Sequence, residues 1–340
     1  MMEKINYDKF SGCTFLITGA TGMIGKSVIN RLVEINKYLE EPVHIIAHIR
    51  NVDKFKKIWG GKEIDNLEYI VSDITKPIIL DKQVDYIVHG ASVTSSKSFI
   101  ECPVDTIHTA LKGTENILNF AKNTNVKKVI YLSSMEVYGT PQNNELISEK
   151  DGVVLDTSVP RNSYPESKRM CESMCSAYHS QYDVPVVVLR LTQTFGPGFD
   201  YNDGRIFAEF TRCVIEDRDI ILHTKGETRR SYLYTEDAVN AIFVSLLNGK
   251  NGENYNVANK TTYCSIYEMA KLVSSLSNTN NVSVKVECQD SSKFGYAPTL
   301  TMNLDTTKLE NIGWSASVGL KKMFQIVIDD FKKKGFGMKG

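Results

Sequence analysis

Two side chains that could share a proton stand four positions apart in "NSYPESKRM", where Tyr164 is followed by Lys168 at the start of an expected helix. A free tyrosine is a poor base at neutral pH because its pKa is about 10. An ammonium group one helical turn away favours the phenolate and lowers that pKa. The pair could therefore act as a general base that removes a hydroxyl proton from a substrate.

A second pair with the same spacing, Tyr267 and Lys271, lies in "SIYEMAKLVSSLS". Ser265 is a typical N-cap for the amphipathic helix expected there. Neither a glycine turn nor a strand-end serine is near this pair in the sequence. We therefore interpret Tyr267 and Lys271 as packing and surface residues.

A strand end with polar residues lies thirty positions before Tyr164, where "VIYLSS" runs into "MEVYG". Ligands of parallel α/β sheets bind beyond the carboxyl ends of the strands, so Ser133, Ser134 and Glu136 should face the cleft that Tyr164 faces. Ser134 could hold the reacting oxygen by a hydrogen bond, while Lys168 could also donate to a nicotinamide ribose. These residues together suggest one catalytic site.

A glycine turn joins the first expected strand to the first expected helix in "FLITGATGMIGKSVINRL". Glycine at such a junction permits a tight turn, lets backbone N–H groups approach a pyrophosphate and lets the helix pack close to the strand. The N-terminus of the helix favours the anion. The turn predicts a dinucleotide site formed by Gly19, Thr21, Gly22, Met23, Ile24 and Gly25.

The choice between NAD and NADP stays open. An acidic residue at the end of the second strand would accept hydrogen bonds from an adenosine ribose and favour NAD, but "VHIIAHIRN" leads into Arg50. A guanidinium pairs well with a 2′-phosphate, so Arg50 favours NADP unless it is a solvated surface residue. Asp73 is placed to meet the adenine edge or to cap the turn at Thr75. Ile74 and Ala91 are expected to line the same site.

Apolar, β-branched runs alternate with helical patterns over the first 190 residues. Unbroken apolar strands separated by helices are typical of a parallel sheet covered on both faces, so we predict an α/β fold with a doubly wound (Rossmann) sheet. Residues 1–194 are assigned to this dinucleotide-binding domain. Its expected elements are strands at 13–19, 43–49, 67–73, 84–92, 127–134 and 184–191, and helices after Gly25 and at 110–123 and 164–182.

The pattern becomes mixed after about residue 195. We assign residues 195–340 to a smaller mixed α/β C-terminal lobe that binds substrate and packs closely on the first domain, since no Pro/Gly/Ser-rich linker separates the two. A strand near 229–235 is expected to return to the first domain. The other expected elements are strands at 219–224 and 282–287, and helices at 204–216, 235–248, 265–277 and 318–333.

Composition limits the class of partner. Forty basic residues balance 40 acidic ones among 340, so no net field favours nucleic acid or an acidic membrane. No apolar run approaches the roughly 18 residues that span a bilayer and the N-terminus lacks a signal-peptide core, so we expect a cytoplasmic protein. Seven cysteines without a Cys-x-x-Cys pair fit a reducing compartment. Cys171 and Cys175 are interpreted as packing residues, and no metal is expected.

Several segments, "TGATGMIG", "LSSMEVYG", "YPESK" and "GP" after a strand, resemble the extended short-chain dehydrogenase/reductase family, in its NAD-dependent epimerase/dehydratase branch of sugar-nucleotide enzymes. The resemblance covers nearly the whole chain and is strongest to UDP-glucuronate decarboxylases. It implies a homodimer built on helices at about 98–122 and 164–182. It implies catalytic roles for Ser134, Glu136, Tyr164 and Lys168, and substrate contacts from Ser134, Gln193, Arg205 and Arg230.

Departures from the family pattern bear on the reaction. Dehydratases of this branch carry an Asp-Glu pair where this chain has Met135 and Glu136, which argues against elimination of water. Decarboxylases keep the glutamate, but Gln193 replaces the family's asparagine before "FGP", and "FGYAPTL" lacks the basic residue that decarboxylases carry there. Epimerisation of a nucleotide-diphosphate sugar through a keto intermediate is therefore the first choice, with decarboxylation next.

Two alternatives differ in class. A net reductase would consume NADPH to reduce a keto sugar or another small carbonyl compound, and Arg50 is the residue that favours it. A non-catalytic, nucleotide-sensing binding protein would use the same fold, because a fold alone does not fix a function. The intact set of Ser134, Tyr164 and Lys168 argues against the binding protein.

Overall fold

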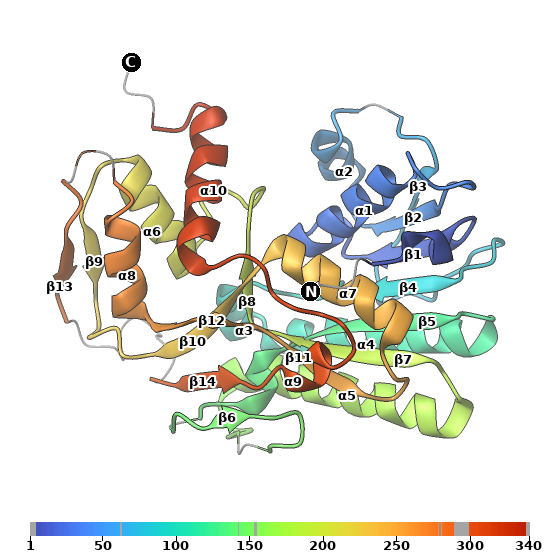
Figure 1. Cartoon of the computed structure of the whole chain (residues 1–340). Coiled ribbons are helices and arrows are strands. Elements are labelled where there is room, and N and C mark those ends of the chain that lie inside the picture. The colour runs from blue at the N-terminus through green and yellow to red at the C-terminus, as the bar shows by residue number, and fades with distance from the viewer. Residues whose placement is uncertain are drawn as a thin grey trace.

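A seven-stranded sheet forms the centre of the first domain in the structure, a computed structural model that describes residues 5–61, 63–141, 143–152, 155–277, 279, 281–288 and 299–337 (Figure 1). Every strand pair in this sheet is parallel, in the order β11-β7-β5-β4-β1-β2-β3. The six predicted strands are confirmed. The members are β1 (Thr14–Thr18), β2 (His44–Ile49), β3 (Leu67–Val71), β4 (Tyr86–His89), β5 (Lys128–Ser134), β7 (Val186–Leu191) and β11 (Asn254–Val257).

Helices cover both faces of this sheet, as predicted for a doubly wound fold. One apolar core joins the sheet to α1 and α7, and a second joins its other face to α4 and α5. The central strands are apolar on both sides because both faces are buried. The helices of this domain are α1 (Met23–Ile35), α2 (Val52–Ile58), α3 (Ser96–Glu101), α4 (Pro103–Asn123), α5 (Ser163–Tyr182) and α7 (Thr235–Asn248).

The second lobe is a mixed α/β unit, also as predicted. A five-stranded sheet runs in the order β12-β10-β14-β6, with β8 paired to β10, and a two-stranded sheet joins β13 to β9. Helices α6, α8 and α10 share one apolar core. The elements are β6 (Leu146–Ile147), β8 (Gln193–Phe195), β9 (Ile220–Leu222), β10 (Arg229–Tyr234), β12 (Asn259–Ser265), β13 (Val284–Val286), β14 (Thr301–Leu304), α6 (Ile206–Ile215), α8 (Ile266–Ser274), α9 (Thr307–Glu310) and α10 (Leu320–Lys333).

The two lobes are interlaced, but not through the predicted strand. The strand near 229–235 is β10, which pairs within the five-stranded sheet. The return to the first domain is made by the two elements that follow it, α7 and β11. In the opposite direction, β6 leaves the first domain and pairs with β14. The strand β10 has only six residues, and its sequence does not specify which of the two sheets it joins.

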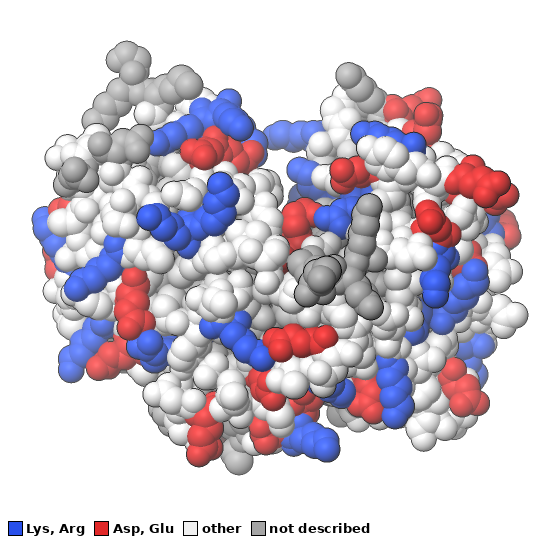
Figure 2. All heavy atoms as spheres, viewed as in Figure 1, with Lys and Arg blue, Asp and Glu red and all other residues white. Residues whose placement is uncertain are grey.

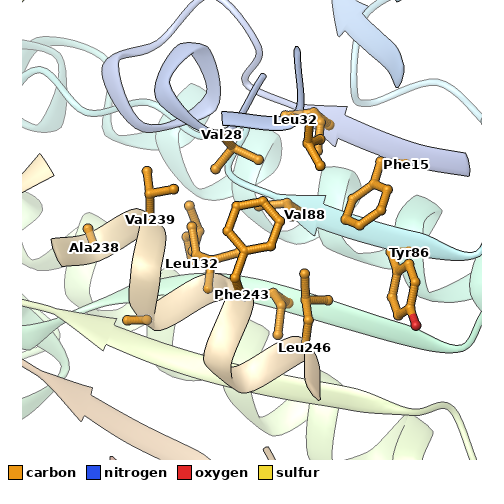
Figure 3. Packing of buried hydrophobic residues seen from close by; sticks show 14 of the residues in the cluster. Phe15, Val28, Leu32, Tyr86, Val88, Leu132, Ala238, Val239, Phe243 and Leu246 are labelled. Atoms are coloured by element: carbon orange, nitrogen blue, oxygen red, sulfur yellow. The ribbon is translucent and has the colours of Figure 1, made fainter. Parts of the chain in front are cut away.

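Apolar side chains of α7 complete the core of the first domain (Figure 3). Phe243 is fully buried and lies edge-on to Tyr7 and Phe10, with ring centroids 5.3 and 5.6 Å away. The same core contains Val28 of α1 and Leu132 of β5. A helix from the C-terminal half of the sequence is therefore part of the dinucleotide-binding domain.

The second Tyr/Lys pair lies on α8, far in sequence from any glycine turn. Ser265 forms a capping box with Glu268 at the start of this helix. Lys271 Nζ lies 4.6 Å from the centre of the Tyr267 ring, and the lysine is exposed. Tyr267 and Lys271 are thus a surface cation–π pair, in agreement with the packing interpretation.

Candidate active site

The glycine turn brings the start of α1 against the end of β1. Gly19 has a φ of 70°, and a Cβ there would lie 2.8 Å from the backbone of Gly90. A Cβ on Gly25 would lie 2.3 Å from the carbonyl oxygen of Gly19, and the Gly22 N–H donates to that oxygen at 2.9 Å. The turn therefore cannot carry side chains at Gly19 or Gly25 without moving. This backbone cradle at a helix N-terminus fits the pyrophosphate of a nicotinamide dinucleotide.

The other residues predicted for the turn are partly exposed where the two lobes meet. Thr21, Met23 and Ile24 all keep some solvent contact. Met23 packs against the core of the second lobe, and Ile24 packs against the core of the first domain. The N–H of Ala91 donates to Thr18 Oγ1 at 3.2 Å, which ties the ends of β4 and β1 together.

The adenosine end of the predicted site lies after β2 and β3. Arg50 is exposed. Asp73 accepts hydrogen bonds from the N–H and hydroxyl of Thr75 at 2.9 and 2.8 Å, and these bonds hold the pKa of its carboxyl below its ordinary value. Of the two roles predicted for Asp73, the structure shows the capping of the turn at Thr75. Ile74 is 3% exposed and its carbonyl oxygen accepts from Asn116 Nδ2, so its side chain belongs to the core.

Buried polar side chains lie along the carboxyl edge of the sheet. Thr18 Oγ1 is 2.7 Å from His89 Nδ1, and His48 Nε2 is 2.8 Å from Ser72 Oγ. Burial, together with the positive charge of Lys168, lowers the pKa of His89 to about 3. His89 is therefore neutral and serves as a hydrogen-bond link between strands rather than as a base.

Tyr164 and Ser134 come together at the end of β5. Tyr164 lies in the first turn of α5 and is buried, with the Ser134 side chain close enough to act on its phenol. Burial raises the pKa of Tyr164 well above its ordinary value, and the carboxylate of Glu136 raises it further. The Ser134 hydrogen bond and the charge of Arg161 act in the opposite direction. The fold therefore brings the predicted catalytic serine and tyrosine to the same strand end.

Lys168 is buried beneath the same strand end. Its Nζ donates to the carbonyl oxygen of Leu132 at 2.8 Å and lies 6.0 Å from the centre of the Tyr164 ring. Burial lowers the pKa of this ammonium. In this structure the ammonium is directed at the strand carbonyl, and burial is the largest influence on the pKa of the Tyr164 phenol.

The segment after Ser134 is a short 3-10 helix, η2 (Met135–Tyr138), in which the side chains of Met135 and Glu136 have different surroundings. The Glu136 N–H donates to Ser134 Oγ at 3.2 Å, and Glu136 Oε2 accepts from Arg161 at 2.8 Å. Met135 is 6% exposed, and its sulfur accepts from the Thr192 hydroxyl. The glutamate therefore points towards the site, while the methionine is part of a small core.

Two site residues were missed by reasoning from the sequence. The ring of Phe99 in α3 stacks on the ring of Tyr164, with centroids 4.2 Å apart and planes inclined by 11°. The Arg161 guanidinium lies 5.1 Å from the centre of the Phe99 ring. The position of Arg161, three residues before Tyr164 in "PRNSY", was the available signal, whereas α3 offers none for Phe99.

Three residues predicted to bind substrate lie in the second lobe, and they differ in whether their polar atoms already have partners. Gln193 and Arg230 lie in β8 and β10 of one sheet, and Gln193 Oε1 and Arg230 Nε are buried without a hydrogen-bond partner in the described part of the chain. A buried N–H without an acceptor is costly, so Arg230 fits an anionic ligand. Arg205 is instead held by Asp203, with contacts of 2.6 to 3.1 Å.

A hollow separates the two lobes, and Lys and Arg side chains lie on both of its rims (Figure 2). This is where a ligand of the glycine turn would meet the second lobe. Within the described ranges no group of three or more His, Cys, Asp or Glu could hold a metal ion. In that same part of the chain, no helix has the length and apolar character to cross a membrane.

Comparisons with known proteins identify relatives of this chain. The model of the NAD dependent epimerase/dehydratase family matches residues 15–258. UDP-glucuronic acid decarboxylase 1 of Xenopus tropicalis is 30% identical over 322 residues, which cover 94% of this chain and 72% of that protein.

Solved structures share the fold at lower identity. UDP-glucose 4-epimerase of Thermotoga maritima, with UDP-glucose, superposes with a TM-score of 0.78 at 20% identity, over 94% of this chain and 99% of that one. UDP-glucuronic acid 4-epimerase of Bacillus cereus, in complex with UDP-glucuronic acid and NAD, gives 0.76 at 20% identity with the same coverage. The chain therefore belongs to the NAD-dependent epimerase/dehydratase family, a branch of the extended short-chain dehydrogenases/reductases whose named relatives are enzymes.

Proposed function

We propose that this protein modifies a nucleotide-diphosphate sugar by oxidising one sugar carbon transiently to a ketone and reducing it again. The observation that carries the proposal is that Tyr164, at the start of α5, and Ser134, at the end of β5, come together at the carboxyl edge of the sheet that also carries the glycine turn. A base, a hydrogen-bond donor and a dinucleotide cradle are what such a cycle needs.

In this mechanism Tyr164 takes the proton of a sugar hydroxyl while Ser134 holds the same oxygen. A nicotinamide dinucleotide, when bound, supplies the transfer of hydride from and to the sugar carbon. Tyr164 must first lose its own proton, which its burial opposes. Cations therefore have to act on it, and the two described ones are Lys168, with its Nζ 6.0 Å from the Tyr164 ring, and Arg161.

The intermediate step that we propose first is inversion of configuration, with decarboxylation next. The position that carries an acid in dehydratases is Met135 here, and its side chain is buried. The segment "FGYAPTL", where decarboxylases carry a basic residue, lies largely outside the described residues. The second lobe would hold the diphosphate through Arg230, whose Nε needs an acceptor.

A net NADPH-dependent reductase is the second candidate. Arg50 is exposed directly after β2, in the place where an acidic residue would favour NAD. A guanidinium there suits the 2′-phosphate of NADP. A reductase consumes one equivalent of cofactor per product, whereas the proposed cycle consumes none.

We also propose that the protein is a homodimer through α4 and α5. Val104 is 75% exposed, Ile107 39% and Met170 53%, which is unusual for apolar side chains on long helices. Cys171 points the other way, since it is fully buried in the core under the sheet. Sedimentation of the wild type against Val104→Glu tests this proposal: a monomeric wild type contradicts it.

The first experiment is mass spectrometry of the small molecules released when the purified protein is denatured, followed by incubation with UDP-glucose and UDP-glucuronic acid. Stoichiometric NAD and an isomerised or decarboxylated product, without net absorbance at 340 nm, support the proposal. An empty protein that binds NADPH in preference to NADH, and oxidises it only when a keto sugar is added as hydride acceptor, supports the reductase. A protein that retains NAD but converts neither UDP-sugar, wild type and Tyr164→Phe alike, contradicts the proposed cycle on these substrates.

A further inference from the structure

An ion pair that no family motif predicted stands beside the Tyr164 ring. Arg161 lies in η3 (Pro160–Asn162), immediately before α5, and its Nη2 donates to Glu136 Oε2 at 2.8 Å. The two side chains are 28% and 31% exposed, so the pair lies at the edge of the site rather than in the core. It joins η2, which follows Ser134, to the segment that leads into Tyr164.

The same guanidinium is linked to Tyr164 by a layer of aromatic contact. Arg161 lies over Phe99, and the Phe99 ring stacks on Tyr164 with centroids 4.2 Å apart. Phe99 is 2% exposed, and its carbonyl oxygen accepts from the Ser163 hydroxyl at 3.3 Å. Cation–π and stacking contacts fix the plane of a ring as well as its position. The orientation of the phenol therefore depends on α3 and η3.

We infer that Arg161 is a positioning residue for the reaction proposed above: it holds the Glu136 carboxylate beside Ser134 and, through Phe99, fixes the Tyr164 ring before substrate arrives. The expected effect on turnover rests on the proposed function. The positions of Arg161, Glu136 and Tyr164 do not, because they are those of the protein without substrate. Without Arg161, Glu136 would be an unneutralised carboxylate near the phenol, and ionisation of the phenol would become harder.

Electrostatics at the phenol agree with this geometry. Among the charged and titratable groups that act on Tyr164, Glu136 raises its pKa and Arg161 lowers it, while the Ser134 hydroxyl favours the phenolate by its hydrogen bond. Lys168 is engaged with the Leu132 carbonyl. Arg161 therefore offsets the carboxylate that the active site keeps next to its own base.

A test without substrate uses 3-fluorotyrosine labelling, with the Tyr164 signal assigned by its loss in Tyr164→Phe. Fluorine acidifies the phenol, so its ionisation can be followed by ¹⁹F NMR. We expect Arg161→Met to raise the apparent pKa by about one unit, as loss of a neighbouring cation does, and Arg161→Lys to restore part of the shift. The matched control is Arg169→Met, because Arg169 pairs at 3.7 Å with Glu166 on α5.

A kinetic test uses the wild type with UDP-glucose or UDP-glucuronic acid. We expect Arg161→Met to lower kcat by about 10- to 100-fold with little change in KM, and guanidinium ion to rescue the variant. The effect should shrink in a Glu136→Gln background, since the two residues then act as one unit. Circular dichroism checks that the variants fold, and Arg161→Lys replaces a variant that does not.

The two tests separate this inference from the proposed function. A wild type that converts neither sugar contradicts the proposed function, while the ¹⁹F titration still decides the role of Arg161. An Arg161→Met titration that coincides with the Arg169→Met control would overturn the inference. So would full additivity of the Arg161 and Glu136 substitutions in kcat.

Discussion

The replacement Gly25→Ala should weaken dinucleotide binding through one backbone contact. A Cβ at this position lies 2.3 Å from the carbonyl oxygen of Gly19, and the obstacle is backbone that no rotamer change can clear. Ordinary contact distances require α1 and the end of β1 to separate by about 1 Å. Overpacking of this kind costs about 1–3 kcal/mol, which corresponds to roughly 5- to 150-fold in an equilibrium constant. We expect the Kd for NAD to rise by about 10- to 100-fold.

Titration of NADH fluorescence, or calorimetry with NAD, measures this effect. Two matched glycines serve as controls. A Cβ on Gly22 lies 3.1 Å from the same oxygen, so Gly22→Ala should cost less, and Gly152→Ala should cost nothing because no atom lies within 4 Å. Wild-type affinity of Gly25→Ala, or a larger loss in Gly22→Ala than in Gly25→Ala, would refute the reasoning that the helix must touch the strand end for the turn to bind.

Three further outcomes are expected. Tyr164→Phe should keep cofactor affinity and lower turnover of UDP-glucose or UDP-glucuronic acid by at least about 100-fold, and unchanged turnover would remove Tyr164 from the mechanism. Phe243→Ala should lower the free energy of unfolding by about 3–5 kcal/mol in urea, because its ring is fully buried where α7 completes the first core; a loss under about 1 kcal/mol would contradict that role. The pKa of His89 is about 3 when folded and near 6.5 when unfolded, so the unfolded chain binds more protons between these pH values and stability is full above pH 6.5 and falls as the pH is lowered. Replacement by glutamine should remove up to about 1.4 kcal/mol per pH unit of that slope, and an unchanged slope would show that His89 does not contribute.

Reasoning from the sequence succeeded where local pattern and spacing carry the information. The spacing of Gly19, Gly22 and Gly25 predicted a tight strand–helix turn. The structure has this turn, and a Cβ at Gly19 or Gly25 would collide with backbone there. Ser134 ends β5 and Tyr164 lies in the first turn of α5, so both residues lie at the carboxyl edge of the parallel sheet. The same reasoning was wrong about the strand near 229–235, since pairing partners are chosen by the whole chain.

Sequence spacing also did not predict where two cationic side chains point. Lys168 is four residues after Tyr164, as predicted, yet its ammonium bonds to the Leu132 carbonyl. Arg205 was predicted to contact the substrate and is engaged with Asp203. In both cases a nearby acceptor in the folded protein captures the cation, and that acceptor comes from backbone geometry or a loop that sequence spacing does not describe.

The sequence by itself determined the parallel sheet, the dinucleotide turn and the serine, tyrosine and lysine of the candidate site, because apolar periodicity and fixed spacings follow from local backbone geometry. Only the tertiary structure decided that α7 and β11 complete the first domain and that Arg161 and Phe99 support Tyr164. Those contacts join segments far apart in the chain, and packing of the whole molecule is what selects them.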